Sequence, residues 1–153
     1  MLQSAKSPER SRNSGPRILV VDDNESVRSY IADLLKKAGW AVDTADSGRH
    51  ALGLLKSGLN PDVVLLDVMM PGLSGMQTLD QLRNNFEKIP VVMVSVAGSA
   101  RKIVAAMQRG AFDYLTKPFD EEALEAVLGR AIENRRANDG VTAKALEKET
   151  TIW

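Results

Sequence analysis

The sequence contains no cysteine and only one histidine. The absence of cysteine excludes disulfide scaffolds, thiol catalysis and zinc sites with thiolate ligands, and it suits a reducing compartment without proving one. The single histidine, His50, excludes chemistry that needs a pair of histidines. We interpret His50 as a surface residue near the start of a helix.

An excess of charge of one sign is also missing, because 20 basic and 20 acidic residues cancel. No global field therefore points to nucleic acid or to an anionic membrane, and we expect direct binding to neither. The apolar runs are strand-sized and far too short to span a bilayer. Residues 1–15 lack the apolar middle region of a signal peptide, so the expected location is the cytoplasm.

The chain has the length of one domain, with 153 residues, of which 44% are hydrophobic. We place the folded domain at residues 16–137. Residues 1–15 are rich in serine and are expected to form a disordered leader, with a basic arm that touches a phosphate backbone as the alternative. Asn138-Asp139-Gly140 is expected to break the last helix, which leaves residues 138–153 as a tail, a short extra helix or a truncated linker.

Apolar runs of strand length alternate with helical stripes five times along the chain. This alternation predicts an α/β fold, a single doubly wound (βα)5 domain with a parallel sheet. The first, third and fourth strands are apolar throughout, whereas the second alternates, so the second is placed at an edge. The flavodoxin-like strand order 2-1-3-4-5 satisfies that pattern. The strands are predicted at residues 18–21, 41–45, 63–66, 91–94 and 111–115.

Each strand is followed by a residue suited to begin a helix. Asn24, Ser47 and Asp120 are typical helix N-caps. Ser74 followed by Gln77 predicts a capping box. The remaining helix is predicted to start at Gly98-Ser99, with Ile103 and Ala106 on its apolar side.

Polar residues follow four of the predicted strands. Asp22-Asp23 follows the first strand, Asp67 the third, Ser95 the fourth, and Lys117 lies near the end of the fifth. The carboxyl ends of parallel strands meet at one edge of a sheet, which is where open α/β folds bind ligands. Taken one at a time, these residues are ordinary helix caps, turn residues and a surface lysine. All of them together at one edge predict a site.

Three carboxylates at one edge repel one another, by about 4 kcal/mol for a pair about 4 Å apart at an effective dielectric of about 20. With only oxygen ligands available, Mg²⁺ is the expected counterion, and Mn²⁺ could replace it. Lys117 adds a positive charge and Ser95 a hydroxyl, which together suit a phosphoryl group. Asp67 is the candidate nucleophile, because its strand is central and its loop exposes it.

At this point the chain resembles the CheY-like receiver domain of bacterial two-component response regulators. The resemblance covers about residues 17–136, and the sequence around Lys117 is most similar to receivers of the nitrogen-regulation type. The residues that carry it are Asp22-Asp23, Asp67 with Pro71-Gly72 and Gly75, Ser95, and Tyr114 with Lys117-Pro118-Phe119.

The resemblance implies that Asp67 accepts a phosphoryl group from a sensor histidine kinase or a phosphotransfer protein. It implies that Asp22, Asp23 and Asp67 hold Mg²⁺ together with the backbone carbonyl of Met69.

The resemblance further implies that Ser95 and Lys117 bind the phosphoryl oxygens. Tyr114 would be the aromatic residue that changes rotamer as Ser95 moves, and the Lys117-Pro118 bond would be cis. The fourth helix, fifth strand and fifth helix would form the partner surface, which could also support a homodimer. Such a protein is a phosphorylation-dependent switch and not an enzyme, beyond slow self-phosphorylation and self-dephosphorylation.

Two departures from the family pattern bear on rate. Val96 stands where receivers usually carry a smaller residue, so its bulk could narrow access to the pocket. Met69 and Ala97 offer no polar side chain to orient an attacking water, which predicts slow self-dephosphorylation.

Two other functions remain open at this point. An aspartyl-phosphate phosphatase would prefer a second acid two positions after the nucleophile, where this chain has Met69. A phosphorylation-independent interaction domain would not require the acids, Ser95 and Lys117 together.

Overall fold

The computed structural model describes residues 15–70, 72–96 and 100–152, with the backbone alone for residues 139–152. The first 14 residues of the predicted leader and the predicted helix start at Gly98-Ser99 lie outside the described residues.

Five parallel strands form one sheet with the order β2-β1-β3-β4-β5. The predicted strand order is therefore confirmed, with the alternating second strand at an edge. β3 is buried at every position, as its unbroken apolar run predicts. The strands are β1 (Arg17–Val21), β2 (Ala41–Ala45), β3 (Val63–Asp67), β4 (Val91–Val96) and β5 (Asp113–Lys117).

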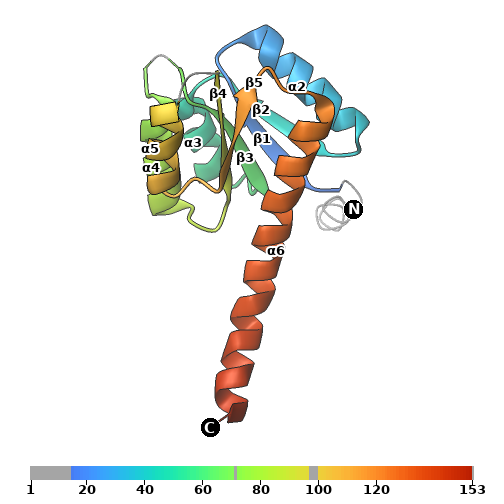
Figure 1. Cartoon of the computed structure of the whole chain (residues 1–153), viewed down its shortest axis with the longest axis vertical. Coiled ribbons are helices and arrows are strands. Elements are labelled where there is room, and N and C mark those ends of the chain that lie inside the picture. The colour runs from blue at the N-terminus through green and yellow to red at the C-terminus, as the bar shows by residue number, and fades with distance from the viewer. Residues whose placement is uncertain (1–14, 71, 97–99, 153) are drawn as a thin grey trace.

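Helices connect the strands and cover both faces of the sheet (Figure 1). The predicted N-caps are confirmed where side chains accept from the first turn, at Asn24, Ser47 and Ser74. Ser74 and Gln77 complete the predicted capping box. The helices are α2 (Glu25–Lys37), α3 (Gly48–Lys56), α4 (Gly75–Asn85), α5 (Ala100–Gln108) and α6 (Glu121–Ile152).

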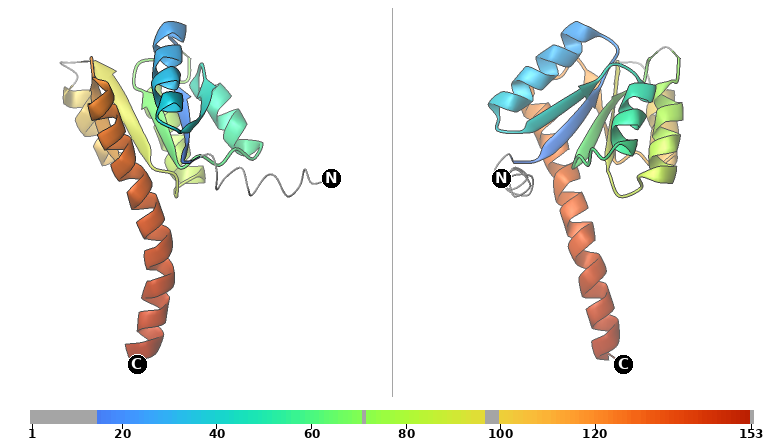
Figure 2. Two further views of the ribbon diagram at one scale, coloured as in Figure 1. Left: turned by 90° about the vertical axis from the view of Figure 1, so that its right-hand side faces the viewer. Right: turned by 180° about the vertical axis from the view of Figure 1, so that it is seen from behind.

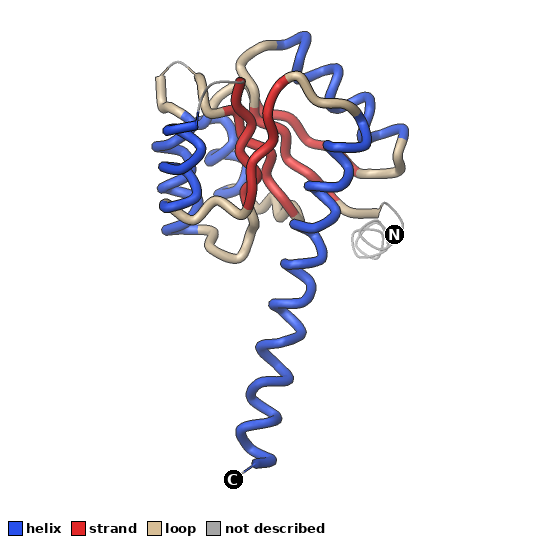
Figure 3. Tube along the Cα trace, viewed as in Figure 1, coloured by secondary structure: helices blue, strands red, loops and turns tan. Residues whose placement is uncertain are grey.

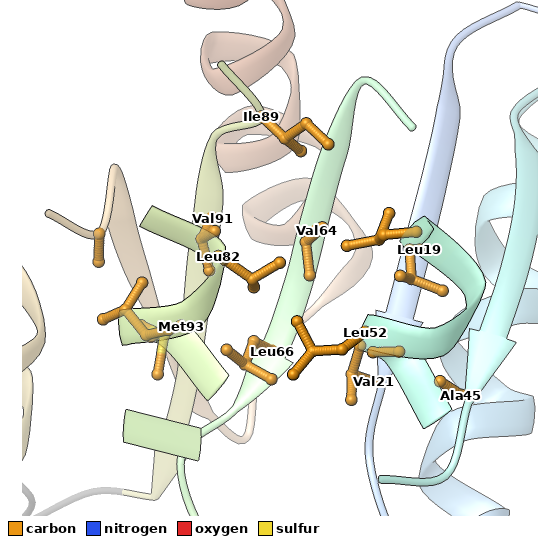
Figure 4. Close-up of a cluster of buried hydrophobic side chains, with 14 of the residues drawn as sticks. Leu19, Val21, Ala45, Leu52, Val64, Leu66, Leu82, Ile89, Val91 and Met93 are labelled. Atoms are coloured by element: carbon orange, nitrogen blue, oxygen red, sulfur yellow. The ribbon is translucent and has the colours of Figure 1, made fainter. Parts of the chain in front are cut away.

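The sheet separates two hydrophobic cores. α3, α4 and α5 lie on one face, and α2 and α6 lie on the other (Figures 1 and 2). Alternate residues of each strand point to opposite faces, so Leu19 and Val21 join the first core while Ile18 and Val20 join the second. Figure 4 shows the first core, where Leu52 of α3 packs near Leu66 and Val21.

β1 and β3 are each one residue longer than predicted, and β4 and β5 differ from the predicted bounds by two residues. β5 begins two residues later than predicted, because the N–H of Ala111 still bonds the carbonyl of Ala106 and so completes the end of α5. β4 continues through Ser95 to Val96, since Ser95 and Val96 pair with Thr116 and Lys117 of the shifted β5. The shift makes Lys117 the last residue of a strand.

The predicted break of the last helix at Asn138-Asp139-Gly140 is wrong, because α6 continues without interruption to Ile152. A glycine inside a helix costs only about 1 kcal/mol relative to alanine, and residues 143–148 are mainly good helix formers. α6 runs past the amino edge of the sheet and projects from the domain, as the ribbon and the Cα trace both show (Figures 2 and 3). Among the described residues, no helix combines the length and apolar character needed to cross a membrane.

Candidate functional site

The site residues predicted from the strand ends lie together at the carboxyl edge of the sheet. Asp22 follows β1 directly, Asp67 is the last residue of β3, and Lys117 is the last residue of β5. Ser95 lies in β4, one position beyond Val94, which pairs with Asp67. The sheet thus brings together side chains from segments as much as 95 residues apart.

Three carboxylates form a cluster at this edge. Asp22, Asp23 and Asp67 each offer an oxygen, and these oxygens lie within 4.8 Å of one another. Asp22 and Asp67 are buried, with 2% and 7% of their surface exposed, whereas Asp23 is open to solvent. Three oxygen ligands with one open side suit a hard divalent cation that keeps several waters.

Lys117 compensates part of this negative charge. Its Nζ lies 3.3 Å from Asp22 Oδ2 and 3.8 Å from Asp67 Oδ2, so one ammonium group is shared between two acids. One positive charge cannot neutralise three carboxylates, so the cluster keeps a net negative charge. The peptide bond between Lys117 and Pro118 is cis, as the resemblance implies.

The environment of Asp67 disfavours its charged form. The pKa of the Asp67 carboxyl group is raised from 3.8 to about 6, mainly by burial and also by the neighbouring charges of Asp22 and Asp23. The backbone N–H of Met69, 3.1 Å from Asp67 Oδ1, and the ammonium of Lys117 lower this pKa in part. A strongly shifted carboxyl group in a charged cluster marks a candidate functional residue.

Ser95 is 2% exposed, and its hydroxyl has no hydrogen-bond partner among the described residues. A buried hydroxyl without a partner costs about 1–3 kcal/mol. Ser95 therefore holds an unused donor at the same edge as Asp67, where an anionic oxygen could accept it.

The other two predicted site residues are mainly exposed. Met69 has 54% of its surface exposed, and its backbone N–H already serves Asp67. Tyr114 lies on the surface of β5 with 42% exposed. Val96, predicted to narrow the pocket, is 53% exposed beside the site.

A close backbone approach fixes the chain after Asp67. A Cβ atom on Gly75 would lie only 2.3 Å from the carbonyl oxygen of Asp67 and 2.6 Å from that of Val68. Any larger residue at Gly75 would push the start of α4 away from the end of β3. The glycine and the Ser74 cap together hold the loop that presents Asp67.

One contact of the site was not predicted from the sequence. The Nη1 atom of Arg28, on α2, donates to the backbone carbonyl oxygen of Asp22 at 2.6 Å. A basic residue beside the apolar position Val27, one turn into the helix after the paired acids, is the signal that could have found it. The N–H of Asn24 also donates to Asp22 Oδ1, at 2.8 Å.

Comparisons with known proteins agree with this geometry. Residues 18–129 match the family described as the response regulator receiver domain. The response regulator MprA of Mycolicibacterium vanbaalenii is 40% identical over 129 residues, which cover 84% of this chain and 55% of MprA. The regulatory protein AtoC of Escherichia coli is 36% identical over 117 residues, covering 76% of this chain and 25% of AtoC.

Solved structures give the same result. The receiver domain of NtrX from Brucella abortus is similar with a TM-score of 0.73 and 36% sequence identity, covering 76% of this chain and 98% of that one.

The chain spans about half the length of MprA. The matched region contains the acid cluster, Ser95 and Lys117. The chain belongs to the response regulator receiver domain family of two-component signalling systems.

Proposed function

We propose that this receiver domain accepts a phosphoryl group on Asp67 and thereby switches conformation. The observation that carries the proposal is the ammonium group of Lys117, shared between Asp22 and Asp67 at the end of the central strand. This arrangement presents a carboxylate nucleophile beside a cation that can bind the oxygens of the incoming phosphoryl group.

Asp22, Asp23 and Asp67 would hold Mg²⁺, with Mn²⁺ as a substitute, and the Met69 carbonyl would add a fourth ligand. The support for this set is the 4.8 Å limit on the separation of the three carboxylate oxygens and the absence of histidine or cysteine from the cluster. When bound, the ion neutralises negative charge on the phosphoryl oxygens.

The transfer step breaks one bond and forms another. A carboxylate oxygen of Asp67 attacks the phosphorus of a phosphohistidine on a kinase or phosphotransfer protein, and a P–O bond forms. The P–N bond breaks, and its electron pair stays on the imidazole nitrogen that leaves. Lys117 Nζ then pairs with one phosphoryl oxygen, and Ser95 donates its unused hydroxyl hydrogen to another.

The switch follows from the new partners. Phosphorylation adds a charge of about −1.5 to −2 and oxygens that are strong hydrogen-bond acceptors. Ser95 and Lys117 contact these oxygens only in the phosphorylated state, which biases the equilibrium towards one conformation. Both residues lie on strands that border α5 and α6. The face built by α5, β5 and α6 is therefore the proposed partner surface, where Val104, Met107 and Tyr114 are exposed. It could also join two copies of the chain.

The loss of the phosphoryl group is proposed to be slow. Met69 presents an apolar side chain beside the site, and Ala97, the other predicted flanking residue, lies outside the described residues. A phosphoryl half-life of seconds would contradict this part of the proposal. Because the curated relatives are longer, an output domain joined through α6 is part of the proposal for the whole protein.

Intact-mass analysis after incubation with Mg²⁺ and acetyl phosphate tests the proposal. The parent protein is expected to gain one phosphoryl mass, and Asp67→Ala is expected to gain none. Asp80→Ala, which removes an acid from an exposed ion pair on α4, is the matched control and is expected to gain mass like the parent. A folded parent that gains no mass from any donor would instead favour the phosphorylation-independent function.

A further inference from the structure

We infer that Arg28 is a positioning residue for the metal site. Its guanidinium holds the peptide group between Asp22 and Asp23 and thereby sets the affinity of the cluster for a divalent cation. The inference is built on the proposed Mg²⁺ site and names a residue outside the acid cluster that controls it.

The contact joins the first turns of α2 to the loop that carries two of the three acids. Nη1 of Arg28 lies 2.6 Å from the Asp22 carbonyl oxygen, and the Arg28 side chain is half-buried. A charge-assisted hydrogen bond of that length in a partly buried setting is among the stronger kinds in proteins. The planar guanidinium also loses less freedom per bond than a lysine would.

The hydrogen bond from Arg28 restrains the peptide group between Asp22 and Asp23. The carbonyl oxygen of Asp22 and the N–H of Asp23 belong to the same rigid peptide plane. Holding that oxygen therefore restrains the rotation on either side of the plane, and with it the direction in which the Asp23 side chain leaves the backbone. The side chain of Asp22 has its own restraints, because Asn24 donates to Oδ1 and Lys117 to Oδ2.

Asp23 lacks such restraints. It is exposed, and its carboxylate accepts no hydrogen bond within the described part of the chain. Its placement near the other two acids thus depends on the backbone, and Arg28 is the side chain that holds that stretch of backbone. Partners that orient metal ligands in this way typically change metal affinity by 10–100-fold when removed.

The charge of Arg28 has the opposite effect on binding. A guanidinium close to the cluster repels a cation, so loss of the charge alone would tighten metal binding. The two effects have opposite signs, and the sign of the change in affinity therefore separates positioning from simple electrostatics.

The test is a Mn²⁺ titration of the metal-free chain followed by the electron paramagnetic resonance signal of free Mn²⁺, with Mg²⁺ as competitor. Arg28→Met and Arg28→Gln, which cannot donate at that reach, are expected to raise the dissociation constant about tenfold. Arg28→Lys keeps a long donor and is expected to recover most of the affinity. Arg130→Met, the same change at an exposed arginine paired with Asp113, is the matched control and is expected to leave affinity unchanged.

A urea midpoint measured in EDTA accompanies each variant. An arginine with a structural role only would lower that midpoint without changing the dissociation constant of the folded protein. Unchanged or tighter binding in Arg28→Met and Arg28→Gln, or failure of Arg28→Lys to recover the affinity, would overturn the inference. A parent protein that binds no divalent cation would instead overturn the proposed function, so the two failures are distinguishable.

Discussion

The charged groups at the two edges of the sheet differ in how far other groups of the chain compensate them. At the amino edge, arginines meet acceptors: Arg17 pairs with Asp43 and donates its N–H to Asp62, and Arg135 donates to the Pro61 carbonyl and to Asn60. At the carboxyl edge, three acids lie close together, and one lysine pairs with two of them.

This difference separates stability from function. Among the described residues, the buried side-chain polar atoms of the amino edge have partners within the chain, with Arg83 Nε as an exception. The carboxyl edge keeps a buried acid with a raised pKa and a serine hydroxyl without a partner. A cation and a phosphoryl group can interact with this acid and this hydroxyl, which the fold leaves without full compensation. The carboxyl edge therefore lowers the stability of the fold and is also the edge that can bind ligands.

Removal of Lys117 is expected to have the largest effect on the function of the carboxyl edge. In Lys117→Met, two buried acids lose their shared cation, and the phosphoryl oxygens would lose the donor proposed for them. We expect the rate of mass gain from acetyl phosphate to fall at least about 100-fold. Lys88→Met, an exposed lysine near the amino edge, should leave the rate unchanged. A rate within a few-fold of the parent in Lys117→Met would show that this ammonium group is not part of the transfer site.

A substitution at the amino edge is expected to lower the stability of the protein and to leave phosphorylation unchanged. Arg135→Met removes donors to the Pro61 carbonyl and to Asn60, which join α6 to the loop before β3. We expect a loss of about 1 kcal/mol in the free energy of unfolding, measured by urea titration, and no change in the rate of phosphoryl gain. A stable variant with altered phosphorylation would mean that the two edges are coupled.

The smallest effect is expected at Val96. Val96→Ala trims a side chain that is 53% exposed beside Ser95, so the free energy of unfolding should change by less than about 0.5 kcal/mol. The rate of mass gain from acetyl phosphate should rise several-fold if bulk at this position narrows the pocket. An unchanged rate would remove Val96 as a determinant of access.

The sheet and its carboxyl edge could be predicted because their signals are local and strong. The unbroken apolar run of β3 predicts a central strand, and a polar residue lies at or next to the end of β1, β3, β4 and β5. Since parallel strands share one carboxyl edge, Asp22, Asp67 and Lys117 could be brought together without coordinates.

The remaining features depend on tertiary context. The bounds of β5 were wrong because Ala111 and Phe112 are apolar and extend the apolar run, although the N–H of Ala111 still bonds the carbonyl of Ala106 at the end of α5. The break in α6 was wrong because a single Gly140 is tolerated in a long helix. The Arg28 contact was missed because its acceptor is a backbone carbonyl, so that the basic residue one turn into α2 is the only trace of it in the sequence.

The raised pKa of Asp67 predicts the direction in which the stability of the protein changes with pH. The folded-state value of about 6 lies above the ordinary value of 3.8, because burial disfavours the charge. The stability that Asp67 contributes is therefore present below pH 3.8 and is lost as the pH rises through 6. Above that range its charged form lowers the free energy of unfolding by at most about 3 kcal/mol, since one pKa unit corresponds to about 1.36 kcal/mol.

The most direct test of the account is the free energy of unfolding of the parent and of Asp67→Asn, measured by urea titration above pH 6 with EDTA and then with saturating Mg²⁺. In EDTA, Asp67→Asn is expected to be more stable by about 1–3 kcal/mol, and the difference should shrink as the pH falls below 6. Mg²⁺ should stabilise the parent more than the variant, because Asp67 is a proposed ligand of the ion and Lys117 compensates its charge only in part. Equal stability of the two proteins in EDTA, with no selective gain from Mg²⁺, would contradict the claim that the carboxyl edge gives up stability for binding.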